Sequence, residues 1–118
     1  MNTSHLFHIT THAEFDAARA TGEYRPAAFA REGFIHCSRA SQVAATAERI
    51  FHGREDLVLL EIDAALLSSS VIDENLEGGL ELYPHIYGAL PIAAVVTVHP
   101  MPLDSHGHFS LPASVTSG

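Results

Sequence analysis

Three histidines lie in short stretches where apolar and polar residues alternate. They are His8 in "LFHIT", His36 in "GFIHCS" and His85 in "PHIYG". In an extended chain, successive side chains point to opposite faces, so each histidine faces away from its apolar neighbours. Imidazole can donate, accept or transfer a proton near neutral pH. These three positions are therefore the first candidates for chemistry.

The stretch around His36 divides its side chains into two sets. Alternation places Phe34, His36 and Ser38 on one side and Ile35 and Cys37 on the other. A nucleophilic cysteine needs a base within reach, and His36 lies on the wrong face to serve Cys37. We therefore expect Cys37 to be a small buried residue beside Ile35.

The same rule places His85 and Tyr87 on one face of their stretch. If the three stretches are neighbouring strands, His8, His36, His85 and Tyr87 line one cleft, with Ser38 at its edge. The alternative is a set of buried histidines bonded to backbone carbonyls. The pattern alone leaves both readings open.

Three histidines could also hold a zinc ion in a metal-dependent hydrolase. Their spacing matches no local zinc motif such as HExxH, and the single cysteine rules out a cysteine-rich site. We therefore expect no metal. The sequence also lacks G-x-G-x-x-G, the P-loop and G-x-S-x-G, so the standard dinucleotide fold, P-loop phosphoryl transfer and the hydrolase elbow have no support.

Composition narrows the class of protein. The chain has 118 residues, 47% of them hydrophobic, which fits one globular domain. Fourteen acidic residues against six arginines give a net charge of -8, which argues against nonspecific nucleic-acid binding. No apolar run is long enough for a membrane span, and "MNTSHLFH" does not resemble a signal peptide. We expect a cytoplasmic protein that makes no contact with a membrane.

The elements that must position these residues begin with a half-buried strand at 6–10. Thr11 is the expected N-cap of a first helix, Glu14 completes a capping box, and Gly22 ends the pattern. Residues 23–31 contain a proline and read as a loop with at most one turn of helix.

A second helix is the clearest element in the chain. Apolar residues at helical spacing cover 43–51, with Ser38 or Ser41 as the cap and Gly53 at the end. The next segment, "LVLLEI" at 57–62, is apolar throughout and reads as a central strand covered on both faces.

The remaining elements are short. We expect a helical turn at 63–67, a strand at 71–74, a turn at 77–79, an extended segment at 82–88 and a strand at 94–98. This order predicts an α+β domain over 1–103 with two main helices. Residues 104–118, rich in Pro, Ser, Gly and His, are expected to form a mobile C-terminal tail.

Several motifs in order resemble a known family. "FHIT", "EGFIHCS", "TAERIF", "DLVLLEID" and "YPHIYG" look like the bacterial domain of unknown function 952 family over residues 6–98. That family is similar in fold to the ADP-ribosyltransferase group, which includes the RNA 2'-phosphotransferases. The resemblance implies a split, curved and mainly antiparallel sheet around an NAD-binding cleft.

The resemblance also implies roles for individual residues. His8 would contact the ribose next to nicotinamide, and His36 and Ser38 would lie in the nicotinamide-ribose region. Arg25 and Arg39, which flank the motif, could hold a diphosphate.

The third catalytic position of that group is usually a glutamate late in the sheet. Here the pattern departs, because Glu74 and Glu81 are both available and His85 or Tyr87 could take the place instead.

These roles predict a small-molecule nucleotide ligand, with NAD as a candidate substrate. Cleavage of the nicotinamide bond passes through an oxocarbenium-like centre, so the protein mainly orients riboses and stabilises charge. The first hypothesis is a cleft that binds NAD or an ADP-ribose derivative and transfers or hydrolyses ADP-ribose. The alternative is a noncatalytic small-ligand sensor, or an interaction module of the toxin-antitoxin type.

Overall fold

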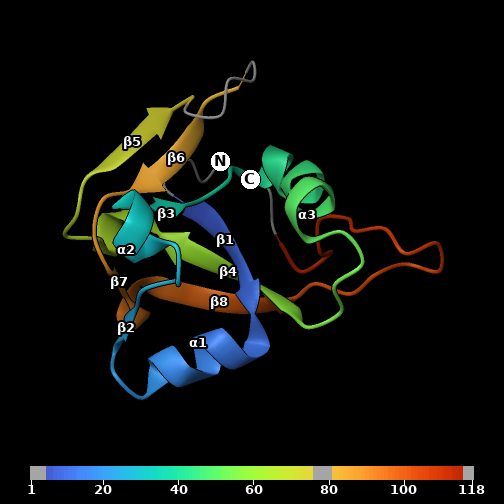
Figure 1. The fold of residues 1–118 in the computed structure, drawn as a ribbon, viewed down its shortest axis with the longest axis horizontal. Coiled ribbons are helices and arrows are strands. Elements are labelled where there is room, and N and C mark those ends of the chain that lie inside the picture. The colour runs from blue at the N-terminus through green and yellow to red at the C-terminus, as the bar shows by residue number, and fades with distance from the viewer. Residues whose placement is uncertain (1–4, 76–80, 116–118) are drawn as a thin grey trace.

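The computed structural model describes residues 5–75 and 81–115, which form an α+β domain with antiparallel strand pairs (Figure 1). The expected turn at 77–79 lies outside these residues. The helices are α1 (His12–Arg19), α2 (Phe29–Glu32) and α3 (Val43–Phe51), with 3-10 turns η1 (Ala40–Gln42), η2 (Ala64–Leu66) and η3 (Ile92–Ala94). The strands are β1 (His5–Thr11), β2 (Glu23–Tyr24), β3 (Ile35–His36), β4 (Leu57–Asp63), β5 (Val71–Glu74), β6 (Tyr83–Ile86), β7 (Leu90–Pro91) and β8 (Val95–Pro100). None of the described helices is long and apolar enough to cross a membrane.

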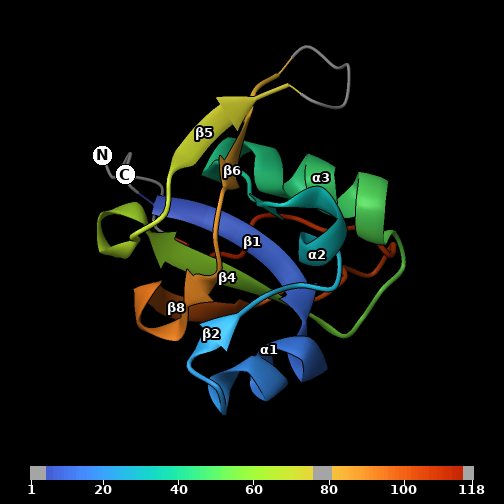
Figure 2. The ribbon, with the colours of Figure 1, turned by 60° about the vertical axis from the view of Figure 1, so that its left-hand side comes forward.

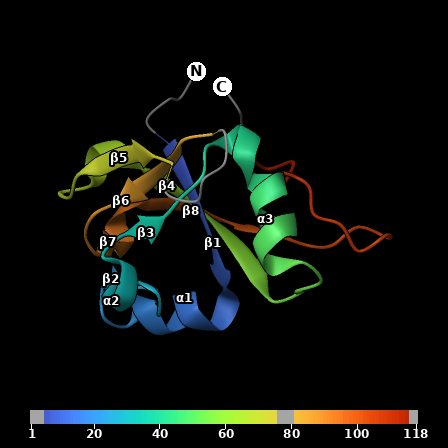
Figure 3. The ribbon, with the colours of Figure 1, turned by 45° about the horizontal axis from the view of Figure 1, so that its top comes forward.

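Two three-stranded sheets position the site. One has the order β1-β4-β8 and the other β3-β6-β5, and β2 pairs separately with β7. An isolated antiparallel bridge between Phe7 and Ser38 connects the two larger sheets. Figure 2 shows β5 beside β6 and β1 beside β4, and Figure 3 shows β3 and α3 on either side of β1.

The central strand β4 confirms the reading of "LVLLEI". Its alternate side chains enter two different clusters, with Leu57 and Leu59 in the one that contains Val43 of α3. Leu60 and Ile62 enter the other cluster, on the opposite face of the sheet. Both faces of the strand are therefore covered, as a continuous apolar run predicts.

The prediction that β1 is half-buried is wrong. Leu6 enters the same cluster as Phe15 of α1, whereas Phe7 and Ile9 pack with α3. Leu6, Phe7 and Ile9 are all at least 93% buried. The polar residues that alternate with Phe7 and Ile9 are covered by other segments, which local sequence does not reveal.

Helix α1 begins where the sequence predicts. The amide of Glu14 donates to Oγ1 of Thr11 at 3.1 Å, so Thr11 is the N-cap. The Glu14 carboxylate does not close the expected capping box within the described chain, because it lies instead beside the hydroxyl of Tyr24, at 3.1 Å. The helix ends at Arg19, and Gly22 then adopts a positive φ of 83°.

Helix α3 has the predicted bounds, but its N-terminus is capped differently from the prediction. Neither Ser38 nor Ser41 caps it, because the 3-10 turn η1 precedes it and Oε1 of Gln42 accepts from the amide of Arg39 at 2.9 Å. The Gln42 amide also donates to the carbonyl of Leu82 at 2.9 Å, which ties the start of the helix to the segment before β6. Gly53 follows the helix with φ 81°.

The segment 104–115 packs more closely than its composition suggests. Phe109 and Val115 are buried in the cluster that also contains Met101 and Val43. The amide of Phe109 donates to the carboxylate of Glu48 on α3 at 2.6 Å. This packing continues beyond the boundary expected at 103, and the mobility of the segment stays a prediction.

Candidate functional site

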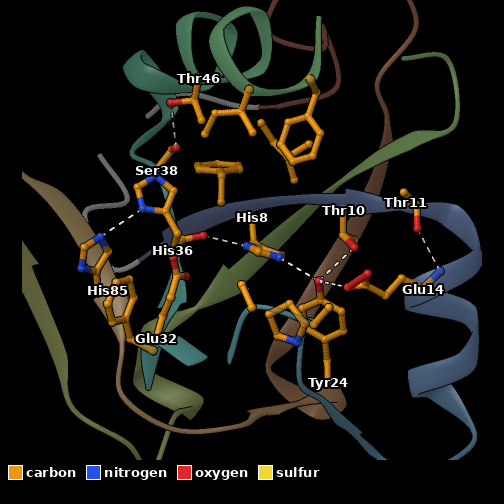
Figure 4. Close-up of a pocket in the computed structure, with 18 of the residues that line it drawn as sticks. His8, Thr10, Thr11, Glu14, Tyr24, Glu32, His36, Ser38, Thr46 and His85 are labelled. Carbon is orange, nitrogen blue, oxygen red and sulfur yellow. Dashed lines mark hydrogen bonds between the residues drawn. The ribbon is translucent and has the colours of Figure 1, made fainter. Parts of the chain in front are cut away.

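A pocket of about 470 Å³ lies between β1, the β3 segment and α3 (Figure 4). Such a volume is within the usual range for a small-molecule site. Much of its wall is apolar, formed by Phe7, Ile9, Pro26, Ala27, Ala28, Phe34, Ile50 and Phe51. Its polar lining consists of His8, Thr10, Thr11, Glu14, Tyr24, Glu32, His36, Ser38, Thr46, Arg54 and His85.

The structure brings four of the predicted site residues together. His8, His36, Ser38 and His85 come from three distant segments and all line the pocket. Ile35 and Cys37 are buried on the opposite side, in the core cluster with Leu60, as alternation predicts.

The register of β3 and β6 explains why two of these histidines meet. His36 and His85 are directly opposite each other in the antiparallel pair, so their side chains leave the same face. Nδ1 of His36 lies 3.0 Å from Nε2 of His85. The Phe34 ring stacks on the His85 ring, with 4.1 Å between centroids and 13° between planes.

A carboxylate completes this arrangement from the neighbouring strand. Glu74 on β5 accepts from Nδ1 of His85 at 2.9 Å and from the hydroxyl of Tyr87 at 2.5 Å. The Tyr87 hydrogen bond, followed by that of His85, lowers the pKa of Glu74, and Glu74 in turn raises the pKa of Tyr87. Glu74 and Tyr87 are not among the pocket-lining residues, and Glu74 contacts the lining through His85.

His8 is held by two protein contacts. Its Nδ1 lies 2.7 Å from the backbone carbonyl of His36, and its Nε2 lies 2.9 Å from the hydroxyl of Tyr24. Because the carbonyl can only accept, Nδ1 carries the proton in the neutral ring. Burial lowers the pKa of His8 to about 4, so the ring is neutral at physiological pH. His8 thus lines the pocket and also matches the alternative reading of a buried histidine bonded to a backbone carbonyl.

Tyr24 is a polar residue of the pocket that no pattern in the sequence indicates. Its hydroxyl lies 2.9 Å from Oγ1 of Thr10 and 3.1 Å from the carboxylate of Glu14, in addition to its contact with His8. Its side chain is almost completely buried, and burial raises its pKa. Tyr24 precedes Arg25 and Pro26 in a segment without periodicity, and no local signal distinguishes it.

The arginines occupy other positions than expected. Arg25 pairs with Glu23 at 3.2 Å and Arg39 pairs with Asp73 at 2.9 Å, and neither is among the pocket-lining residues. Arg54, which follows α3, lines the pocket and pairs with Asp56 at 2.6 Å. The sequence shows Arg54 beside acidic residues, which reads as a solvated surface pair.

The glutamates of the pocket also differ from the expected ones. Glu14 and Glu32 line it, although the sequence singled out Glu74 and Glu81. Glu81 accepts from Nε2 of Gln42 at 3.1 Å, near the start of α3. Helix α2, which carries Glu32, is the single helical turn expected in the loop before β3.

The described residues do not form a site for a nucleophilic cysteine or for a metal ion. Cys37 is buried and burial raises the pKa of its thiol, so it is not activated as a nucleophile. Across residues 5–75 and 81–115, no group of three or more His, Cys, Asp or Glu side chains is placed to hold a metal ion.

Comparison with known proteins identifies the family. The crystal structure of protein CC0527 from Caulobacter crescentus is 34% identical, covers 91% of this chain and 94% of its own, and superposes with a TM-score of 0.81. The solution NMR structure of CC0527 is similar at a TM-score of 0.78, with 90% of this chain and 91% of its own covered. No protein with a curated description matches. The family model described as "Protein of unknown function (DUF952)" matches residues 9–98. The chain therefore belongs to the DUF952 family.

Proposed function

We propose that the pocket binds NAD or an ADP-ribose derivative, and that the fold is related to the ADP-ribosyltransferase group. One observation carries the proposal. His8, His36 and Ser38, the residues that the family resemblance would place around the nicotinamide ribose, line a single pocket of about 470 Å³. Apolar and aromatic walls with a few convergent polar groups are typical of a small-molecule site.

The polar lining suits a sugar between ring systems. Phe34 and Phe51 offer surfaces to a planar base, and His36 and Ser38 offer hydrogen bonds to hydroxyl groups. In ADP-ribosyl transfer or hydrolysis, the bond from ribose C1 to the nicotinamide nitrogen breaks and its electron pair leaves with nicotinamide. An acceptor hydroxyl or water then bonds to C1 and loses a proton. Glu14 and Glu32 are the carboxylates in the lining that could stabilise the cationic centre.

A specific observation favours a second candidate, a noncatalytic sensor of the same ligand. Glu74, the glutamate late in the sheet, is bonded to His85 and Tyr87 and is not part of the lining. In this position it does not reach a ribose hydroxyl in the pocket. Binding without cleavage would follow if neither Glu14 nor Glu32 replaces it.

Thermal unfolding with NAD, ADP-ribose and 2'-phosphorylated RNA tests the proposal. A ligand at 100 times its dissociation constant stabilises the folded state by about 2.7 kcal/mol, which a melting curve detects. His36→Ala should abolish the shift, whereas Arg25→Ala, outside the lining, should retain it. No shift with any of these ligands contradicts the proposal. Release of nicotinamide from NAD by the wild-type protein then separates the enzyme from the sensor.

A further inference from the structure

We infer that the hydroxyls of Ser38 and Thr46 form a subsite for a vicinal diol, which in the proposed ligand is a ribose. The inference rests on the proposed function and assigns a binding role to Thr46, a residue of "TAERIF" for which the family resemblance implies no role. Both side chains line the pocket, and each is 97% buried. Figure 4 shows the two hydroxyls facing each other, Ser38 from the β3 segment and Thr46 from α3.

The two hydroxyls are poorly bonded for such buried groups. Oγ of Ser38 lies 3.4 Å from Oγ1 of Thr46, whereas a good hydrogen bond between hydroxyls spans about 2.7 to 2.8 Å. Among the residues that the structure describes, this is the sole side-chain hydrogen bond of either hydroxyl. Buried polar groups are normally well paired. Two hydroxyls with spare capacity on a pocket wall therefore point to a ligand that completes their bonding.

The backbone around the pair is firmly held, so the hydroxyls are positioned in advance. The amide of Ser38 donates to the carbonyl of Phe7 at 2.7 Å, and the carbonyl of Ser38 accepts from the amide of Phe7 at 2.9 Å. Thr46 lies between the buried residues Val43 and Ala47 on the face of α3 that packs against the sheet. A ligand can gain these hydrogen bonds at a small cost in ordering.

The charges of the lining favour a neutral ligand group at this point. Two carboxylates, Glu14 and Glu32, face the same pocket, and the guanidinium of Arg54 already pairs with Asp56. His8, the nearby imidazole on β1, carries no charge at neutral pH. A vicinal diol is neutral, and each of its hydroxyls both donates and accepts, as do Ser38 and Thr46. Phosphate and carboxylate groups only accept and would add negative charge.

The test uses Thr46→Val, which keeps the shape of the side chain and removes its hydroxyl. We expect the dissociation constant of ADP-ribose, measured by isothermal titration calorimetry, to rise about tenfold, and Ser38→Ala to have a similar effect. Thr46→Ser should keep most of the affinity. Thr97→Val on the exposed part of β8 is the matched control and should bind as the wild type does.

Stability and ligand analogues separate the inference from simpler explanations. Because the Thr46 hydroxyl makes a poor bond in the free protein, Thr46→Val should unfold at the same temperature or higher. Two ADP-ribose analogues, each lacking the 2'-hydroxyl of one of the two riboses, should be compared. For the analogue that lacks the hydroxyl bound at the subsite, Thr46→Val and the wild-type protein should bind with equal affinity. Wild-type affinity in both variants, or an equal loss for all analogues, overturns the inference alone. If neither ADP-ribose nor NAD binds the wild-type protein, the proposed function fails as well.

Discussion

Nε2 of His85 and Nδ1 of His36 lie 3.0 Å apart, and the other nitrogen of His85 contacts Glu74 at 2.9 Å. The carboxylate accepts a hydrogen bond from the N–H at Nδ1 of His85, so Nε2 of the neutral ring is an acceptor. Nδ1 of His36 must then donate to it. The three residues therefore form a directed chain from β5 to the pocket wall, which fixes the tautomer of both imidazoles.

Removing the middle of this chain should destabilise the protein. His85→Leu removes the hydrogen bonds that His85 makes to Glu74 and His36 and loses the stacking with Phe34. We expect the free energy of unfolding in urea to fall by about 2 to 4 kcal/mol. His12→Leu, on the exposed surface of α1, should change it by less than about 0.5 kcal/mol. Equal losses in both variants would show that this chain of hydrogen bonds contributes nothing to the stability of the fold.

The acid stability of the protein should depend on Tyr87. The Tyr87 hydroxyl is the largest cause of the lowered pKa of Glu74, with His85 second. A lowered carboxyl pKa stabilises the fold above the ordinary value, and this contribution is lost as the pH falls through the lowered pKa. In Tyr87→Phe we expect a smaller contribution from Glu74 at neutral pH, and an acid-induced loss that is smaller and is complete at a higher pH. Urea unfolding from pH 3 to 7 measures both, and superimposable curves would contradict the prediction.

His8 should weaken the fold in mild acid. Its pKa is about 4 in the folded protein and about 6.5 in an unfolded chain, so only the unfolded chain takes up the proton between these values. The free energy of unfolding should therefore decrease by about 3 kcal/mol as the pH falls from 6.5 to 4. Nitrogen NMR should find a neutral His8 with its proton on Nδ1 at pH 6. A titration of His8 near 6.5 in the folded protein would refute this account.

Tyr24→Phe tests the hydroxyl that joins His8 to Thr10 and Glu14. The substitution keeps the buried ring and leaves these polar groups without their shared partner. We expect a loss of about 1 to 3 kcal/mol in the free energy of unfolding. Tyr83→Phe is a suitable control for the same chemical change, because Tyr83 is only partly buried. A loss of the same size in both variants would count against a special role for Tyr24.

The segment after β8 should contribute to stability through Phe109. Its side chain is 94% buried, and its amide bonds to Glu48. Phe109→Ala should lower the free energy of unfolding by about 3 kcal/mol. Hydrogen exchange should show protection of the Phe109 amide comparable to that in α3. Fast exchange and an unchanged stability would instead support a mobile tail.

Local patterns in the sequence are sufficient to predict several helices and strands, and to predict which side chains of a strand face the core. The run 57–62 predicts the central strand, and helical spacing with Gly53 predicts α3. Alternation places Cys37 in the core and His36 in the pocket. These outcomes follow from strand and helix periods, which each segment carries by itself.

The partners of these side chains depend on the tertiary structure. Tyr24, Glu14 and Arg54 belong to the pocket because of how separate segments pack, and their immediate neighbours in sequence do not indicate it. The N-cap predicted for α3 is wrong for the same reason, since Gln42 at its start bonds to Leu82 across 40 positions of sequence. The meeting of His36 with His85 likewise requires a particular register between strands 49 residues apart. The sequence alone thus determined which faces are polar, and long-range packing decided which polar groups meet, because strand register is set by contacts that no single segment contains.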